Sequence, residues 1–457
     1  MEQNRERLGS RLGFILLSAG CAIGLGNVYR FPIITGAYGG AIFVVIYIAF
    51  LLLLGLPVMT AELSVGRASQ RSIASSFDKL EKPGQKWHWM KYLGISGNYL
   101  LMMFYTTITG WMLMYLIKYV DGSILSASGT AELSAVFGSM ISNPGRSVLA
   151  TYAVIILCFG ICSIGLQKGV ERITKVMMVA LFVLMVGLAA YSCTLPGAKE
   201  WLKFYLVPSV QHVRESGLWT VVTAAMGQAF FTLSLGMGSI AIFGSYIDKN
   251  HRLLGEARTI VTLDTMVALM SGLIIFPAYF TYNGSPITAG NAGAGFLFTT
   301  LSSIFNDMAG GRVIGAFFFL FMLFAALSTV VAVFENIMSF WLELTKLNRR
   351  QAALLNIGLL LVLALPAALT ENLLSGVRIF GKSFMDLEDF LVSNLILPFG
   401  SLIYVLFCTS RYGWGWNNYF TEVNTGKGAA MPGWIRPYMT YVLPVMIFVI
   451  LVMSLIG

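Results

Sequence analysis

The amino-acid sequence predicts an all-α integral membrane protein in which about eleven helices cross the bilayer and two of these helices are broken near mid-membrane. Two observations carry this prediction. The first is composition: of 457 residues, 57% are hydrophobic and only 11% are charged, whereas soluble domains carry about 25% charged residues. This number of charged residues is too small to cover a water-exposed surface, and lipid must therefore cover much of the chain. The second is that glycine clusters interrupt two of the apolar segments.

The membrane-spanning segments follow from the length of chain that crosses the hydrocarbon core, about 20 apolar residues in a helix. We expect one membrane domain over residues 1–457. Its spans lie roughly at 11–35, 40–66, 90–120, 148–166, 172–194, 219–246, 258–281, 312–343, 351–369, 389–410 and 435–456.

Lysine and arginine gather in alternate loops, which predicts the orientation of the chain. Basic residues precede the first span and occupy the loops after the second, fourth, sixth and eighth spans. The N-terminus is therefore predicted to be cytoplasmic. Because the number of spans is odd, the C-terminus is predicted to lie on the opposite, extracytoplasmic side of the cell (inner) membrane. Topology explains the net charge of +9, so we expect a lipid bilayer and no nucleic acid as a partner.

The two interrupted segments share a small-x-Gly-x-Gly core, at 22–26 in the first span and at 234–238 in the sixth. Glycine costs roughly 1 kcal/mol per residue in a helix interior, so such clusters favour unwinding. Unwound backbone at membrane depth is tolerated only where protein buries it or where it lines a cavity. Its free carbonyls can then bind a cation and its free N–H groups an anion. The alternative is that the glycines only permit close helix packing.

The positions of the two clusters predict an inverted repeat. They lie five spans apart, and because five is odd the two halves have opposite orientations. We expect residues 11–194 and 219–410 to form the two five-helix repeats, with 435–456 as an appended eleventh helix. Paired interruptions at matching places in two halves are typical of a transporter's binding site.

Two motifs resemble those of the neurotransmitter:sodium symporters. The first runs from Arg11-Leu12-Gly13 through Gly24-Leu25-Gly26-Asn27 to Arg30-Phe31-Pro32, and the second is Gln228-Ala229-Phe230-Phe231-Thr232-Leu233-Ser234-Leu235-Gly236. The resemblance covers about residues 8–400 and is strongest to the bacterial eleven-helix branch, which includes the leucine transporter. It implies sodium-coupled symport of hydrophobic or aromatic L-amino acids by alternating access.

The resemblance also implies two sodium sites made of oxygen ligands, as a hard cation requires. The first would use the Ala22 carbonyl, Asn27, Thr232 and Asp264. The second would use the carbonyls of Gly20, Ile23 and Ala325 and the hydroxyls of Ser328 and Thr329. The hydroxyl pair has another possible use, which is to bond back to its own helix.

Asp264 departs from the asparagine that is usual in the family, and an acid inside a span suggests a functional role. Tyr47, Gln228 and Thr232 match the neighbourhood that holds chloride in animal members. Because Asp264 supplies its own negative charge, we predict no chloride requirement, and a role in proton coupling is open. The alternative is a protonated acid that only donates a hydrogen bond.

Gly24 stands where carriers of decarboxylated amines have an aspartate, so the resemblance implies a substrate with its own carboxylate. Backbone N–H groups of Leu25 and Gly26 and the Tyr105 hydroxyl would bind that carboxylate. The ammonium group would meet the carbonyls of Ala22, Phe231 and Thr232. The apolar side-chain pocket would contain Leu101, Tyr105, Phe231, Ser234, Met237 and Val333. For Leu101 and Val333, ordinary helix packing is nearly as good an interpretation.

Ion pairs are suited to act as gates because exposed pairs contribute only about 0–1 kcal/mol. The resemblance implies an outer pair of Arg30 with Asp389 and an inner pair of Arg5 with Glu343, the latter beside Tyr246. Glu62 is expected to brace the broken segments. A further family feature is missing. In the family, a proline often stands ten residues after the glycine at position 169 and lets the fifth helix unwind, but this chain has Val179 there. The resemblance therefore does not imply a release route for the inner sodium.

Two rival functions remain at this level: a proton-coupled amino-acid carrier on the same fold, and a sensor that binds amino acid without moving it. An enzyme is not expected, because the chain has three histidines and no nucleophile elbow, P-loop or metal-ligand spacing.

Overall fold

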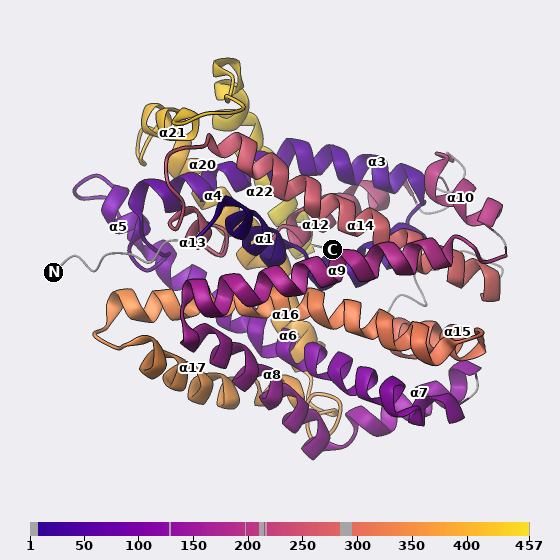
Figure 1. Cartoon of the computed structure of the whole chain (residues 1–457). Helices are drawn as coiled ribbons and strands as arrows, with labels where there is room; N and C mark the ends of the chain where they lie inside the picture. Colours follow the sequence, from indigo (N-terminus) through magenta and orange to yellow (C-terminus); the bar gives the residue numbers. More distant parts are fainter. Residues whose placement is uncertain are drawn as a thin grey trace.

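The chain is almost entirely helical in the computed structural model, which describes residues 8–127, 129–196, 198–209, 214, 217–283 and 295–456. Within these residues the β structure amounts to two isolated bridges, His251 with Lys427 and Ile379 with Lys382. Figure 1 shows the long helices packed side by side in one bundle. The all-α prediction is confirmed.

The helices follow one another without intervening strands. In the first half they are α1 (Arg11–Ala22), η1 (Gly26–Arg30), α2 (Phe31–Ala37), α3 (Ala41–Phe50), η2 (Leu51–Gly55), α4 (Leu56–Ser69), α5 (Ser76–Leu80), η3 (Trp87–Trp89), α6 (Met90–Asp121), η4 (Ser123–Ser126), α7 (Gly129–Ile141), α8 (Pro144–Ile164), η5 (Leu166–Glu171) and α9 (Arg172–Ser192). In the second half they are α10 (Ala198–Leu206), α12 (Leu218–Thr232), α13 (Ala241–Gly244), α14 (Leu253–Asn283), η7 (Phe296–Leu301), α15 (Ser302–Asp307), α16 (Gly311–Leu344), α17 (Arg349–Leu363), α18 (Leu365–Ala368), α19 (Phe384–Phe390), η8 (Leu391–Ile396), α20 (Leu397–Thr409), α21 (Trp416–Asn424), η9 (Gly433–Ile435), η10 (Tyr438–Val442) and α22 (Leu443–Ile456).

Eight continuous helices among the described residues are long and apolar enough to cross a bilayer, and the bent pair of α1 with η1–α2 makes a ninth. The sixth and ninth predicted spans are shorter as continuous helices than the sequence suggested. The sixth stops at Thr232 where its glycine cluster follows, and α17 gives way to α18 at Pro366. Proline lacks the N–H that would continue the helical ladder, which explains the second interruption.

Both predicted breaks are present. The first span ends its first helix at Ala22, and the chain bends by 55° before helical structure resumes at Gly26. After α12, Ser234, Gly236 and Gly238 adopt positive φ angles of 50°, 96° and 79°. Glycine reaches that region without a Cβ penalty, so the cluster ends the helix as the sequence predicts.

The longest helix, α16, runs through the centre of the bundle. It packs against α6, α9, α8 and α1, and Figure 1 shows it crossing the bundle between α9 and α17. Its residues from Ala325 to Phe340 are all buried. Polar side chains on this stretch therefore face other helices rather than lipid.

Candidate functional site

The two breaks face each other around a small cavity in the middle of the bundle. Its volume is about 20 Å³, room for about one water molecule. The lining residues are Ala22, Gly24, Leu25, Gly26, Leu101, Tyr105, Phe231, Thr232, Ser234, Met237, Thr329, Val392 and Leu397. Every substrate residue inferred from the sequence is therefore at the cavity except Val333, which is fully buried elsewhere in α16.

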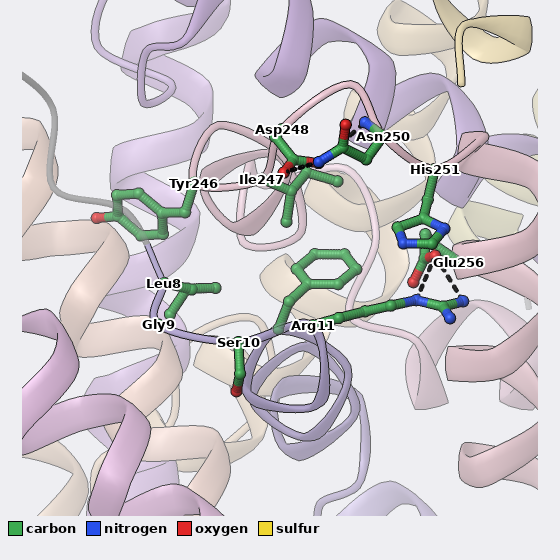
Figure 2. Close-up of a pocket in the computed structure, with 11 residues that line it drawn as sticks. Leu8, Gly9, Ser10, Arg11, Tyr246, Ile247, Asp248, Asn250, His251 and Glu256 are labelled. Carbon is green, nitrogen blue, oxygen red and sulfur yellow. Dashed lines mark hydrogen bonds and ion pairs between the residues drawn. The ribbon is translucent and has the colours of Figure 1, made fainter. Parts of the chain in front are cut away.

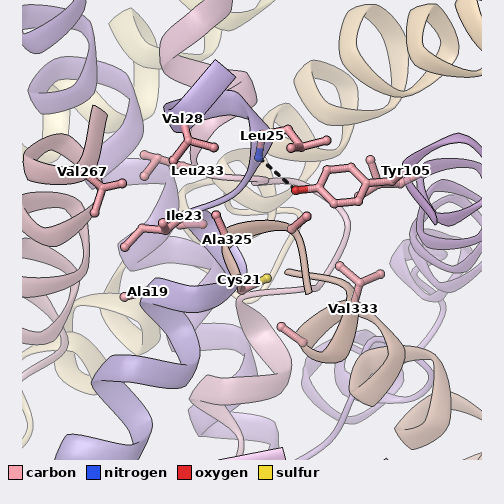
Figure 3. Packing of buried hydrophobic residues seen from close by; sticks show 14 of the residues in the cluster. Ala19, Cys21, Ile23, Leu25, Val28, Tyr105, Leu233, Val267, Ala325 and Val333 are labelled. Carbon is pink, nitrogen blue, oxygen red and sulfur yellow. Dashed lines mark hydrogen bonds between the residues drawn. The ribbon is translucent and has the colours of Figure 1, made fainter. Parts of the chain in front are cut away.

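Side chains accept hydrogen bonds from the backbone N–H groups of the first break, which lack partners within a helix. The Leu25 N–H donates to the Tyr105 hydroxyl of α6 over 3.0 Å, as Figure 3 shows. The Gly24 N–H donates to the Asn27 side chain over 3.1 Å. A Cβ at Gly24 would lie 2.5 Å from the Tyr105 oxygen and 2.7 Å from the Thr329 hydroxyl. No side chain, and no aspartate, fits at position 24 in this arrangement.

A buried polar cluster joins the two breaks to α14. The Asn27 amide donates to a carboxylate oxygen of Asp264 over 2.8 Å and to its backbone carbonyl over 3.1 Å. The Thr232 hydroxyl lies 3.2 Å and 3.3 Å from the two carboxylate oxygens. All three side chains are at most 1% exposed. Their oxygens form a hard donor set of the kind that suits a small cation.

A second oxygen cluster lies where α16 meets the first break. The Thr329 hydroxyl lies 3.1 Å from the Gly20 carbonyl and 3.2 Å from that of Ile23. The Ser328 hydroxyl instead bonds the Ala325 carbonyl of its own helix over 2.9 Å. The structure thus brings together all five residues of the inferred second sodium site, and their hydroxyl and carbonyl oxygens fit that ion.

Glu62 of α4 braces the second break. Its carboxylate accepts hydrogen bonds from the N–H groups of Gly236, Ile240 and Ala241 over 2.8, 3.0 and 3.3 Å. The side chain is fully buried. Gln228 ties the two breaks together, since its amide donates to the Gly26 carbonyl over 2.7 Å. Unwound backbone that would otherwise lack partners is satisfied in this way.

The inferred outer gate is not closed as an ion pair in this conformation. The Arg30 guanidinium lies over the Phe231 ring, 4.3 Å from its centroid. Asp389 accepts a 2.7 Å hydrogen bond from Ser393, and no ion pair joins it to Arg30 in the described part of the chain. Phe231, which lines the cavity, is therefore capped by the arginine.

Two of the residues predicted for the inner gate, Glu343 and Tyr246, have other partners that the structure describes. Glu343 accepts hydrogen bonds from the Ser72 N–H over 2.6 Å and the Ser75 hydroxyl over 2.7 Å. Tyr246 donates to Glu335 over 2.8 Å. Arg5 lies outside the described residues.

Next to Tyr246 lies an acidic residue that the sequence analysis missed. Glu335 is fully buried in α16 and pairs with Arg349 over 2.5 Å. The feature of the sequence that could have identified Glu335 is an acidic residue inside an apolar span. A second cavity, of about 260 Å³, lies between the start of α1 and the 246–256 segment. Figure 2 shows Arg11 and Glu256 among its lining residues, and the ion pair between them measures 2.8 Å.

The sequence and the fold are both similar to those of known proteins. The model of the sodium:neurotransmitter symporter family matches residues 5–131 and 127–457. An uncharacterized sodium-dependent transporter of Bacillus subtilis, YhdH, is 35% identical over 89% of this chain and 88% of its own length. An uncharacterized sodium-dependent transporter of Haemophilus influenzae is 29% identical over 99% of both chains. The crystal structure of MhsT in complex with L-phenylalanine superposes with a TM-score of 0.86 at 35% identity, covering 99% of this chain and 100% of MhsT.

Proposed function

Because the chain belongs to the sodium:neurotransmitter symporter family, whose members are membrane-embedded secondary transporters and not enzymes, we propose that it takes up hydrophobic and aromatic L-amino acids with sodium. The observation that carries this proposal is the pair of broken helices around an apolar cavity. In this proposal, N–H groups of the first break would meet the substrate carboxylate, and carbonyls of both breaks would meet its ammonium group. The MhsT structure, which contains L-phenylalanine, supports an aromatic substrate.

The chemistry of the cavity favours an amino acid over an amine. Gly24 leaves no room for a carboxylate supplied by the protein, so the substrate would bring its own. That carboxylate would meet the Leu25 and Gly26 N–H groups and the Tyr105 hydroxyl. Leu101, Phe231 and Met237 surround the side chain with apolar surface, where a charged side chain would lose its hydration without compensation.

Two sodium sites are part of the proposal. Ala22, Asn27, Thr232 and Asp264 would hold the first ion beside the substrate carboxylate. Gly20, Ile23, Ala325, Ser328 and Thr329 would hold the second and so join the first helix to α16. A bound cation at each place stabilises the bent first span, because its carbonyls then face a positive charge. Binding of sodium and binding of substrate thereby favour the same conformation.

Alternating access would follow from the two repeats, residues 11–194 and 219–410, moving against each other around this site, with 435–456 appended. Arg30 with Asp389 would close the outer side and Arg5 with Glu343, beside Tyr246, the inner side. The loop charges support a cytoplasmic N-terminus. We propose the cell membrane as its location.

Uptake into proteoliposomes, with and without an inward sodium gradient, tests the proposal against a panel of amino acids. We expect sodium-driven accumulation of phenylalanine, tryptophan and leucine, and none of lysine or glutamate. Equal accumulation without sodium, driven instead by a proton gradient, would favour the rival proton-coupled carrier. Saturable binding with no accumulation under either gradient would favour a sensor.

A further inference from the structure

The tenth span, formed by α19, η8 and α20, contributes two side chains to the central cavity. Val392 and Leu397 both line it, and both are at most 2% exposed. They are apolar, and they share the cavity with the first-break residues that would receive the substrate's charged groups. This wall of the cavity is therefore available to the substrate's side chain.

A local irregularity of the helix places both residues at the cavity. Residues five apart in a regular α-helix point about 140° apart, because each residue turns the helix by about 100°. In η8 the Leu397 N–H bonds the Val392 carbonyl, which closes a π turn between the two cavity residues. The wider turn brings their side chains toward one side. Single π turns inside α-helices are frequent at functional sites.

Pro398 gives a physical reason for the π turn. It is the second residue of α20 and has no N–H to donate to the carbonyl four residues earlier. The α-helical ladder is therefore interrupted at this point whatever the surroundings. The irregularity is a property of the sequence of this span, and the cavity makes use of it.

Helix α20 is also held close against the second break. A Cβ at Gly236 would lie 2.4 Å from the Leu397 carbonyl oxygen, and one at Gly400 would lie 2.0 Å from the Gly236 carbonyl oxygen. Ile396, the neighbour of Leu397, faces α6, since a Cβ at Gly97 would lie 2.7 Å from its side chain. Backbone packing thus sets the position of this wall.

We propose that Val392 and Leu397 determine which hydrophobic side chains the site accepts. This inference rests on the proposed function, because it concerns the substrate of the same cavity. Met237 on the neighbouring break is flexible and adapts to shape, whereas the two residues on the tenth span are branched and fixed. One methylene in an apolar pocket changes selectivity by roughly 10- to 200-fold. The size of residue 397 therefore sets the upper size limit of the substrate.

The test compares initial uptake rates of tryptophan and valine by Leu397→Ala, Val392→Leu and the wild type. Leu397→Ala is expected to raise the tryptophan-to-valine ratio of kcat/KM by about tenfold, and Val392→Leu to lower it by about tenfold. Ile396→Ala is the matched control, because it truncates a neighbouring buried residue that does not line the cavity, and its ratio should stay within about twofold of the wild type. If Leu397→Ala does not fold, Leu397→Val provides a milder enlargement with a change in the same direction.

The outcomes separate this inference from the proposed function. A wild type that takes up both amino acids with sodium, together with unchanged ratios in the Leu397 and Val392 variants, would overturn the role of the tenth span alone. An equal shift in Ile396→Ala would also overturn it, since the effect would then come from general loosening of the helix. A wild type without sodium-driven uptake would overturn both proposals.

Discussion

Replacing Glu62 by alanine is expected to reduce sodium-driven uptake at least about 100-fold. Its carboxylate accepts hydrogen bonds from three N–H groups of the second break. A buried donor left without an acceptor costs about 1–3 kcal/mol, and each 1.36 kcal/mol lost from transition-state stabilisation is a factor of ten in rate. The measurement is the initial rate of phenylalanine uptake in proteoliposomes, normalised to the amount of protein incorporated.

The conservative variant Glu62→Gln separates this brace from a general loss of folding. Glutamine keeps one carbonyl oxygen that can accept from the same backbone, so uptake should be intermediate. Both variants should elute as a single symmetric peak in detergent if the helices remain packed. Uptake by Glu62→Ala at the wild-type rate would show that the break does not need this carboxylate.

Replacing Asp264 by asparagine is expected to make transport depend on chloride. The wild type should take up phenylalanine equally well in sodium chloride and sodium gluconate, because Asp264 supplies a negative charge beside the first oxygen cluster. Asparagine keeps the shape and the hydrogen bonds with Asn27 and Thr232 but removes the charge. In gluconate we expect the apparent sodium affinity of Asp264→Asn to fall about tenfold, or about 1.4 kcal/mol. Chloride should restore part of the lost sodium affinity.

Asp307→Asn is a suitable control for this experiment. Asp307 ends α15 and is exposed, so its neutralisation should leave sodium and chloride dependence unchanged. A strong loss of wild-type uptake in gluconate would contradict the proposed role of Asp264. So would an Asp264→Asn variant whose uptake in gluconate matches that of the wild type.

Much of the central site could be predicted because the glycine clusters are visible in the sequence and because the two motifs resemble those of the family. The cluster at 234–238 ends a helix for a local reason, and three of its residues do adopt positive φ. The motif residues Asn27, Thr232 and Asp264 lie far apart in the sequence and meet in one buried cluster. Residues whose position follows from the break itself were therefore placed correctly at the cavity.

The remaining features depend on packing that a sequence pattern does not encode. Val333 has the apolar character of a pocket residue, but its place on α16 buries it away from the cavity. Val392 and Leu397 both line the cavity with a π turn between them, whereas a regular helix would point their side chains about 140° apart. Arg30 contacts the Phe231 ring rather than Asp389, because the geometry of a gate depends on the conformational state.

Titration of phenylalanine binding at different sodium concentrations tests most directly whether the two broken helices form one coupled site. In purified protein the affinity for phenylalanine should rise at least about tenfold when sodium replaces choline, and the affinity for sodium should rise by the same factor when phenylalanine is present, since coupling between sites is reciprocal. Asn27→Ala should remove most of this coupling. The same affinity for phenylalanine in sodium and in choline would contradict the account.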